Sequence, residues 1–463
     1  MLGFLSRRVS LWTVLLVLAV PALVAAYALA AWRYHWPPVA QLSELKRYVE
    51  GVGEVRRTTL WEKLSNDFGF EPARYTFPRQ LADRFPEGRA LAEDGIFRDD
   101  RLLPRSWQRD GTTGATPADD LVLVYGVFEF GDSRFGSVLI DPSAGPNGRI
   151  VRYWPTLVGQ TGGDPDKNGF DPISGLQIVK HTAGQVAAIS YCGEELWAMR
   201  GSRGVLHHSI EFTRDGTAFW MLEALDAVKY DLQGRELKRL AFNDLMVTNP
   251  QDGALRLRLW DRGWTLDSVP RWGVRYGIPR APGIGYMSHF DRVHDPLHVN
   301  DAQPVPASFF PEYPGELVGL SYRNIDLVMI ADVDTAEIVA RIVARTSRQH
   351  DIDFNDDGTV TIFDNNVHVG DVRIVEWDIE EDAVTTVFDA SVMEQENVAH
   401  GNHTKFGRDG YLIVDFKGRV YTVEGGEPRW ILENTYDDAQ ALVLRNAWLL
   451  PRANYERLEA RCN

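Results

Sequence analysis

The sequence contains little cysteine and lacks an excess of positive charge. Cys192 and Cys462 are the only cysteines among 463 residues, so the chain can form at most one internal disulfide. In an exported protein the two could pair and tie the C-terminus to an early repeat; two free thiols are the alternative. Acidic residues outnumber Lys and Arg by 65 to 49, which gives a formal net charge of -16. This balance argues against a nucleic-acid partner and against an anionic membrane surface, because nothing would neutralise phosphates in bulk.

A long uncharged segment is present near the N-terminus. Residues 11–32 carry no charge and are dominated by Leu, Val and Ala, and they are long enough to cross a bilayer as a helix. Arg7 and Arg8 precede them, which places the short N-terminus in the cytoplasm. A cleaved signal peptide with a site at residues 28–30 is the alternative. We therefore predict a single-pass anchor of the cell inner membrane over residues 1–36, with the bulk of the chain in the periplasm.

Residues 37–117 show only weak periodicity. Two short amphipathic helices are expected at residues 40–51 and 61–68, and the rest of the segment is rich in Arg, Asp and Pro. We interpret residues 37–117 as a helical or irregular linker or cap.

Histidines begin a series of regularly spaced hairpins in the remainder of the chain. The most regular hairpin begins at His350 and turns at an Asp-Gly pair seven residues later, and a similar one begins at His208. His298, His350 and His403 follow one another at intervals of 52 and 53 residues. A period near 50 residues, with about four strands in each repeat, is typical of a β-propeller. We predict an all-β domain over residues 118–463, a six-bladed β-propeller, in which residues 244–287 form an insert or an additional blade. Five or seven blades are alternatives, and a pair of β-sandwiches would not explain the regular phase of the hairpins.

The first strand of each propeller blade lines the central channel. Residues at one phase of successive repeats therefore meet around the axis, and His208, His298 and His350 are expected to converge there, joined by His403 or by its neighbour Asn402. Grouped imidazoles permit proton transfer, nucleophilic attack or metal binding near neutral pH. The other histidines are interpreted as structural, core or surface residues: His181, His207, His289, His294, His368 and His400.

Two polar residues accompany these histidines. Asn300 follows His298 at the two-residue spacing of a strand, so a neutral hydrogen-bond donor shares a face with an acid or base. Arg323 begins a strongly apolar strand, where a guanidinium needs an anion; its planar fork suits sulfate, phosphate or carboxylate.

These motifs together resemble the bacterial arylsulfotransferase family. The resemblance covers residues 205–414 and includes, in the family's order, the hairpin at His208, the motif His298-Val299-Asn300, the strand that Arg323 begins, and the run from Gln349-His350-Asp351 to Phe363-Asp364-Asn365. Tyr322-Arg323-Asn324 departs from the family's Ser-Arg-His context. Members of the family are six-bladed propellers that move a sulfuryl group between phenols without a nucleotide sulfate donor.

The resemblance implies a role for each matching residue. His350 matches the histidine that is transiently sulfated, and His208, His298, Asn300 and Arg323 match other functional positions. Neutral His350 would attack sulfur, while Arg323 and His298, with Asn300, would hold the sulfuryl oxygens. His208 would exchange a proton with the phenols. The expected partners are a small phenolic sulfate donor and a phenol acceptor, with no cofactor and no metal.

Two other functions fit the same sequence. One is a non-catalytic propeller that serves as a binding or scaffolding subunit of a membrane complex, as the anchor and the N-terminal 120 residues suggest. The other is a metal-dependent hydrolase that uses the same histidines. Carboxylates at the positions of the repeat that are equivalent to the histidines would favour the hydrolase. Asp301 and Asp351 lie next to those positions and not at them.

Overall fold

The computed structural model describes the chain in the following ranges: residues 76–78, 89–90, 104–108, 120–130, 133–144, 148–156, 168–182, 185–200, 206–223, 225–249, 298–323, 326–343, 345–366, 371–381, 383–393, 395, 400–415, 418–434 and 440–462. The predicted membrane anchor at residues 11–32 lies outside these ranges. Within them, none of the helices combines the length and the apolar character that a membrane crossing requires.

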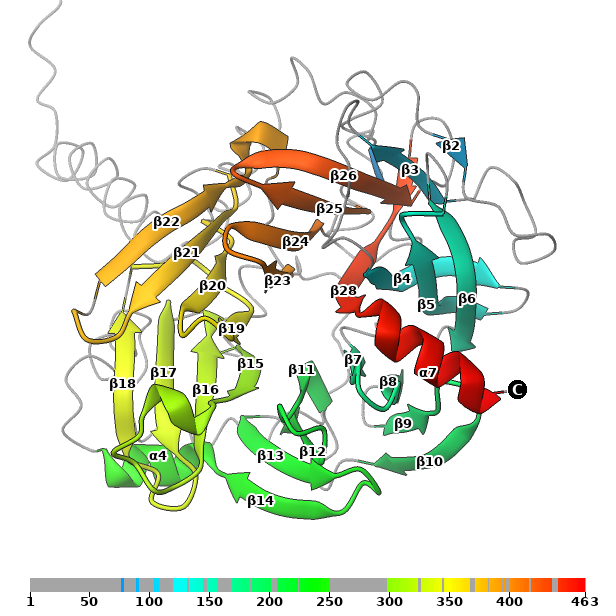
Figure 1. The fold of residues 1–463 in the computed structure, drawn as a ribbon. Helices are drawn as coiled ribbons and strands as arrows, with labels where there is room; N and C mark the ends of the chain where they lie inside the picture. Colours follow the sequence, from blue (N-terminus) through cyan, green and yellow to red (C-terminus); the bar gives the residue numbers. More distant parts are fainter. Residues whose placement is uncertain are drawn as a thin grey trace, which may run out of the picture.

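Six four-stranded antiparallel units surround a central axis (Figure 1). From the innermost strand outward, blade 1 consists of β28 (Leu444–Leu450), β4 (Leu121–Phe130), β5 (Ser133–Asp141) and β6 (Arg149–Thr156), and blade 2 of β7 (Asn168–Phe170), β8 (Gln177–Thr182), β9 (Gln185–Ile189) and β10 (Glu195–Arg200). Blade 3 consists of β11 (Leu206–Phe212), β12 (Ala218–Glu223), β13 (Asp226–Asp231) and β14 (Glu236–Leu240), and blade 4 of β15 (Val299–Pro304), β16 (Leu317–Tyr322), β17 (Leu327–Asp332) and β18 (Ile338–Val343). Blade 5 consists of β19 (Ile352–Phe354), β20 (Val360–Asp364), β21 (Arg373–Asp378) and β22 (Ala383–Asp389), and blade 6 of β23 (Asn402–Phe406), β24 (Gly410–Asp415), β25 (Arg419–Glu424) and β26 (Glu427–Asn434). The prediction of an all-β, six-bladed propeller is confirmed.

The apolar core lies between neighbouring blades. Side chains alternate along a strand, so Trp220 and Leu222 of β12 pack against blade 4, whereas Phe219 and Met221 of the same strand pack against blade 2. All six residues of β12 are consequently buried. Each blade is held on both faces, which orients its innermost strand toward the channel.

The two ends of the propeller domain meet in blade 1. The innermost strand β28 comes from the C-terminus and pairs with β4, with Ala447 opposite Val124. Helix α7 (Arg452–Cys462) then lies over blades 1 and 2 (Figure 1). Its last residue is disulfide-bonded to Cys192, in the turn between β9 and β10. Of the two states that the sequence leaves open for the cysteines, the structure contains the disulfide.

Three short strands come from the segment interpreted as a linker or cap. β3 (Pro104–Gln108) pairs with β26, β2 (Arg89–Ala90) pairs with β3, and β1 (Thr76–Pro78) pairs with β27 (Gln440–Leu442). β2 and β3 therefore extend blade 6, whereas β1 and β27 form a separate two-stranded sheet. Strands of two to five residues are too short to show a clear alternation of apolar and polar positions, which explains why the sequence pattern is weak there.

The long interval between His208 and His298 does not place an additional blade between blades 3 and 4. β11 and β15 lie next to each other, and blades 3 and 4 share one apolar cluster. Helix α4 (Phe242–Thr248) follows β14, and residues 250–297 lie outside the described ranges.

Candidate functional site

Strained backbone marks the start of the innermost strand in four consecutive blades. The residues with a left-handed φ there are His208 (35°), His298 (49°), Arg348 (54°) and His400 (63°). Residues other than glycine rarely adopt this conformation, and such strain concentrates at functional sites. A β-bulge interrupts the pairing of β11 between His207 and Ile210. Bulges re-aim side chains near active sites, and here one re-aims His208 at the mouth of the channel.

Four imidazoles gather at this mouth. The Nε2 atoms of His208 and His298 lie 2.8 Å apart, and the ring of His208 lies 6.3 Å from that of His350 and 5.6 Å from that of His400. His208, His350 and His400 are buried, and His298 is partly exposed. The structure therefore brings the three predicted histidines together and adds His400, which the sequence interpretation had treated as an ordinary residue.

The His208–His298 contact holds a single proton between two rings. A hydrogen bond between two Nε2 atoms requires one of them to carry a hydrogen and the other to offer its lone pair. A pair that carries one additional proton, as an imidazolium beside a neutral imidazole, can give that proton to a nearby group and take it back.

The hydrogen bonds of His350 define its tautomer. Its Nδ1 lies 2.5 Å from Oδ1 of Asn365 and 3.1 Å from the carbonyl oxygen of Arg348. Both partners are acceptors, so Nδ1 carries the hydrogen. Nε2 accepts the backbone N–H of His400 at 3.0 Å. His350 is therefore neutral, with its lone pair on Nε2, since the bond at one ring nitrogen determines the state of the other.

An ion pair between partly exposed Arg373 and buried Asp364 anchors the loop that leads to His350. Asp364 accepts the backbone N–H of Ser347 at 2.7 Å and Nε of Arg373 at 2.7 Å. Burial raises the pKa of the Asp364 carboxyl, and these two donors offset part of that rise. Asp364 is the last residue of β20, and Asn365 follows it directly. The ion pair therefore fixes the position of Asn365, which accepts the Nδ1–H of His350.

Asn300 and Arg323 have different surroundings in blade 4. Asn300 is fully buried, and its Nδ2 donates to the carbonyl oxygen of Gln349 at 2.8 Å. This amide therefore joins blade 4 to the residue before His350. The backbone N–H of Arg323 donates to the carbonyl oxygen of His298 at 3.1 Å, and the Arg323 side chain is 1% exposed. The backbone of Arg323 thus lies directly beside that of His298.

His403 and Asn402 lie outside the imidazole cluster. The His403 ring contacts Oδ2 of Asp351 at 3.0 Å through Nδ1 and Oγ1 of Thr361 at 2.8 Å through Nε2. Nδ2 of Asn402 donates to both carboxylate oxygens of Asp351. His400 takes the place that the sequence phase assigned to this pair. His400 is 50 residues from His350, which fits the repeat as well as the 53 residues between His350 and His403. This spacing is the feature of the sequence that could have identified His400.

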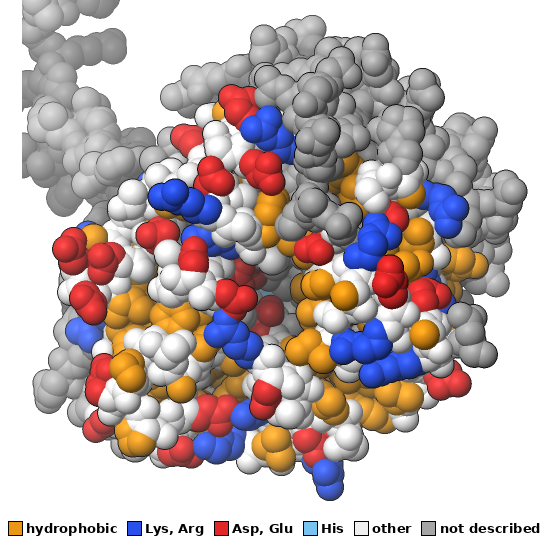
Figure 2. All heavy atoms as spheres, in the orientation of Figure 1, with side chains coloured by type: hydrophobic (Ala, Val, Ile, Leu, Met, Phe, Trp, Pro, Cys, Tyr) orange, Lys and Arg blue, Asp and Glu red, His pale blue; other side chains and the backbone are white. Residues whose placement is uncertain are grey.

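Carboxylates line the channel below the imidazoles, and Figure 2 shows acidic side chains inside the central opening. Glu211, Asp301 and Asp351 each have a carboxylate oxygen that could bind a metal ion, and these oxygens lie within 4.8 Å of one another. The same holds for the carboxylate oxygens of Asp351 and Asp353 and a ring nitrogen of His403. Asp301 accepts the backbone N–H of Ile352 at 2.8 Å, and Asp351 accepts that of His403 at 2.8 Å. These bonds join blade 4 to blade 5 and blade 5 to blade 6, so the carboxylates hold the blades together.

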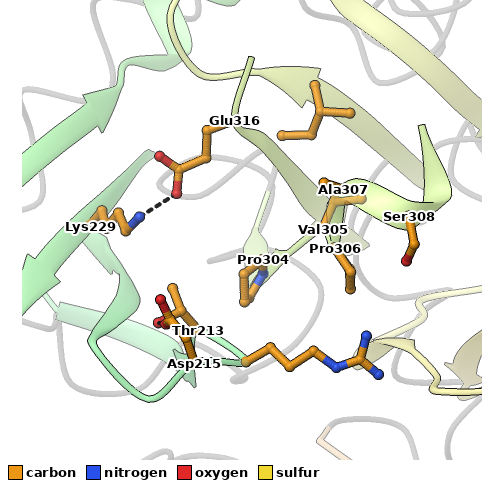
Figure 3. Close-up of a pocket in the computed structure, with 11 residues that line it drawn as sticks. Thr213, Asp215, Lys229, Pro304, Val305, Pro306, Ala307, Ser308 and Glu316 are labelled. Atoms are coloured by element: carbon orange, nitrogen blue, oxygen red, sulfur yellow. Dashed lines mark hydrogen bonds and ion pairs between the residues drawn. The ribbon is translucent and has the colours of Figure 1, made fainter. Parts of the chain in front are cut away.

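A cleft of about 430 Å³ lies at the opposite end of β11 (Figure 3). Thr213, just after that strand, lines it, whereas His208 lies near the start of the strand. An ion pair of Lys229 and Glu316, 2.5 Å apart, crosses one side. Charged and apolar side chains both line the cleft, which is separate from the imidazole cluster.

No family model matches the sequence, and no curated protein matches it. Among solved structures, the chain is similar to a protein of unknown function from Bacteroides caccae, with 12% sequence identity, a TM-score of 0.44, and coverage of 72% of this chain and 98% of that chain. It is also similar to the dihydro-heme d1 dehydrogenase NirN, with 11% identity, a TM-score of 0.34, and coverage of 68% of this chain and 54% of that chain. Likeness at this level says nothing about the activity of this chain.

Proposed function

We propose that this protein is an arylsulfotransferase-like enzyme that moves a sulfuryl group from a phenolic sulfate to a phenol through a covalent intermediate on His350. The observation that carries the proposal is the state of that residue: a buried, neutral imidazole whose Nδ1–H is held by Asn365 and whose Nε2 carries the lone pair. A neutral imidazole is the form that attacks an electrophile.

The first half of the reaction transfers the group to the enzyme. The Nε2 lone pair of His350 forms the bond to sulfur as the bond between sulfur and the phenolic oxygen breaks. The electron pair of that bond leaves on the phenolate. The His208–His298 pair, whose nitrogens lie 2.8 Å apart, enters this step as one imidazolium and one neutral imidazole, and it gives its extra proton to the phenolate. In the second half the acceptor phenol returns a proton to the pair and attacks sulfur, and the N–S electrons return to Nε2.

The charge on the sulfuryl oxygens needs a cation that is already in place. Arg323 is buried beside His298, and a guanidinium matches a tetrahedral oxyanion with two parallel donors. Asn300 supports the site from behind, since its amide holds the Gln349 carbonyl next to His350.

The proposal places the propeller outside the cytoplasm, tethered to the inner membrane by residues 11–32. The Cys192–Cys462 disulfide supports this placement, because disulfides persist in oxidising compartments. The sequence of the N-terminal segment supports the tether.

The test is turnover of a chromogenic aryl sulfate with a phenol acceptor by the parent and by His350→Asn. Asn keeps a hydrogen-bonding side chain and lacks the nucleophilic nitrogen, so transfer should fall by several orders of magnitude while folding survives. Arg323→Lys should be milder, because a point charge does not reproduce the bidentate fork. His403→Asn is the matched control, since it removes an equally buried channel imidazole outside the cluster.

Thermal unfolding of each variant provides the folding control. Mass spectrometry of the parent, incubated with donor alone, should find one sulfuryl group on the peptide that contains His350. Transfer by His350→Asn at the parent's rate would show that another group is the nucleophile. A parent that turns over no aryl sulfate would favour the binding or scaffolding alternative.

A further inference from the structure

The hydrogen bonds around His350 form a closed set that includes two groups with no assigned role. Asn365 accepts the Nδ1–H of His350 at 2.5 Å, and its Nδ2 donates to the carbonyl oxygen of His400 at 2.7 Å. The backbone N–H of His400 completes the set by donating to Nε2 of His350 at 3.0 Å. Asn365 and the His400 peptide therefore control both ring nitrogens of the same imidazole.

An amide at position 365 has a different effect from a carboxylate. Either side chain can accept the Nδ1–H, but a carboxylate would also stabilise the charged imidazolium and raise the pKa of His350. The charged ring carries a hydrogen on Nε2 and has no lone pair to offer. Asn365 therefore fixes the tautomer while leaving the ring neutral and nucleophilic.

The backbone that supplies the His400 N–H packs closely against Phe363. His400 and Gly401 both have a left-handed φ, 63° and 139°. A Cβ at position 401 would lie 2.1 Å from Cε1 of Phe363. Phe363 in turn exchanges backbone hydrogen bonds of 2.8 Å with His350 and Asp351. The His400 N–H is thus positioned against the same strand that carries Asn365.

We propose that Asn365 and the backbone N–H of His400 are the positioning groups of the His350 nucleophile, and that the N–H passes from Nε2 to an oxygen of the group that becomes bound there. The inference rests on the proposed function and adds a sequence of contacts to it. In the resting state the N–H holds the lone pair of Nε2. For the N–S bond to form, the N–H has to leave the lone pair of Nε2, and it then donates to a sulfuryl oxygen that carries negative charge. The Nδ1 proton stays in place, and Asn365 Oδ1 stabilises the positive charge on the sulfated ring.

Several titratable or charged groups surround His350, and their charges affect its pKa. They are His208 and His400 by ring contact, Arg348 and Asp351 as chain neighbours, and the Asp364–Arg373 ion pair beside Asn365. A test of Asn365 therefore needs a control that changes the charge nearby while leaving the contact with the imidazole unchanged.

Asn366→Asp is that control for Asn365→Asp. The adjacent Asn366 donates its Nδ2 to the carbonyl oxygen of Asp371 at 3.0 Å, so both substitutions add one charge and remove one amide-to-carbonyl bond. Hydrogen exchange at the imidazole C2, read by mass spectrometry on the full chain, gives a pKa for each histidine. Asn365→Asp should raise the pKa of His350 by about one to three units, whereas Asn366→Asp should not. The acid limb of kcat/KM should move to higher pH by the same amount.

Two outcomes separate the positioning role from the chemistry. An equal pKa of His350 in both variants would overturn the positioning role of Asn365, whatever the protein catalyses. If the pKa moves as expected but the parent transfers no sulfuryl group, the positioning stands and the proposed function fails, together with the passage of the N–H to a sulfuryl oxygen.

His400→Gly tests the backbone N–H against the side chain. Glycine keeps the N–H and accepts the left-handed φ, so formation of the sulfated intermediate should fall by less than the roughly 100-fold that loss of one oxyanion donor costs. A loss as large as that of His350→Asn would show that the His400 imidazole acts, and would overturn the role given to the N–H.

Discussion

Removing the disulfide should lower the free energy of unfolding by about 3–5 kcal/mol. Cys192 and Cys462 are separated by 270 residues, and chain entropy for a closed loop of that length gives about 5.6 kcal/mol at 25 °C. Measured effects usually fall below this ideal value. The ring is also closed by β28, so the variant Cys192→Ser/Cys462→Ser should fold.

The fold holds α7 in place by a second means. The Glu459 carboxylate accepts Nε and Nη2 of Arg152 at 2.8 and 2.9 Å and the hydroxyl of Tyr191 at 2.7 Å. These contacts should stabilise the fold by about 1–2 kcal/mol, because they are charged hydrogen bonds on a partly exposed surface. If the disulfide acts mainly on the unfolded chain, its removal and Glu459→Gln should add within about 0.5 kcal/mol.

Urea titration of the four proteins, followed by the fluorescence of the 14 Trp residues, measures both quantities. The set consists of the parent, Cys192→Ser/Cys462→Ser, Glu459→Gln, and the combination. A loss below about 1 kcal/mol on removal of the disulfide would refute the chain-entropy argument. A coupling above about 1 kcal/mol would show instead that the bond acts in the folded state by holding Glu459 against Arg152.

Three further predictions follow from the same geometry. The pKa of Glu459 is lowered from its usual 4.5, first by its hydrogen bond from Arg152, so the stability it supplies is present above pH 4.5 and lost as the pH falls through the lower folded-state pKa. The parent should therefore lose stability in acid more steeply than Glu459→Gln, as urea titrations between pH 3 and 6 would show; equal slopes would contradict the assignment. Gly401→Ala should abolish transfer and lower the melting temperature, because its Cβ would meet the Phe363 ring, whereas Gly358→Ala has open space around it and should keep transfer, as turnover measurements would check. The anchor at residues 11–32 should be retained, and N-terminal sequencing that finds mature protein beginning at Ala31 would show it to be cleaved.

The candidate site was only partly predictable from the sequence. The spacing of His208, His298 and His350 predicted their meeting, because residues one repeat apart occupy equivalent places around a propeller axis. His400 was not predicted, because the interval of 53 residues from His350 pointed to His403 instead. The innermost strands begin with a left-handed residue, as at His400, or contain a bulge, as in β11. Either feature shifts which residue faces the channel, and neither has a periodicity that a sequence shows.

The sequence by itself determined the repeated unit of this protein. Alternation of apolar and polar residues makes strands, Asp-Gly pairs turn them, and a period near 50 residues makes four-stranded blades, all of which are local effects. Only the tertiary structure decided that β28 completes blade 1, that residues 104–108 extend blade 6, and that Asn365 and His400 hold the two nitrogens of His350. Each of these contacts joins residues that are far apart in the chain or separated by a strained turn. Their formation depends on the closure of the whole ring, which no segment of the sequence specifies alone.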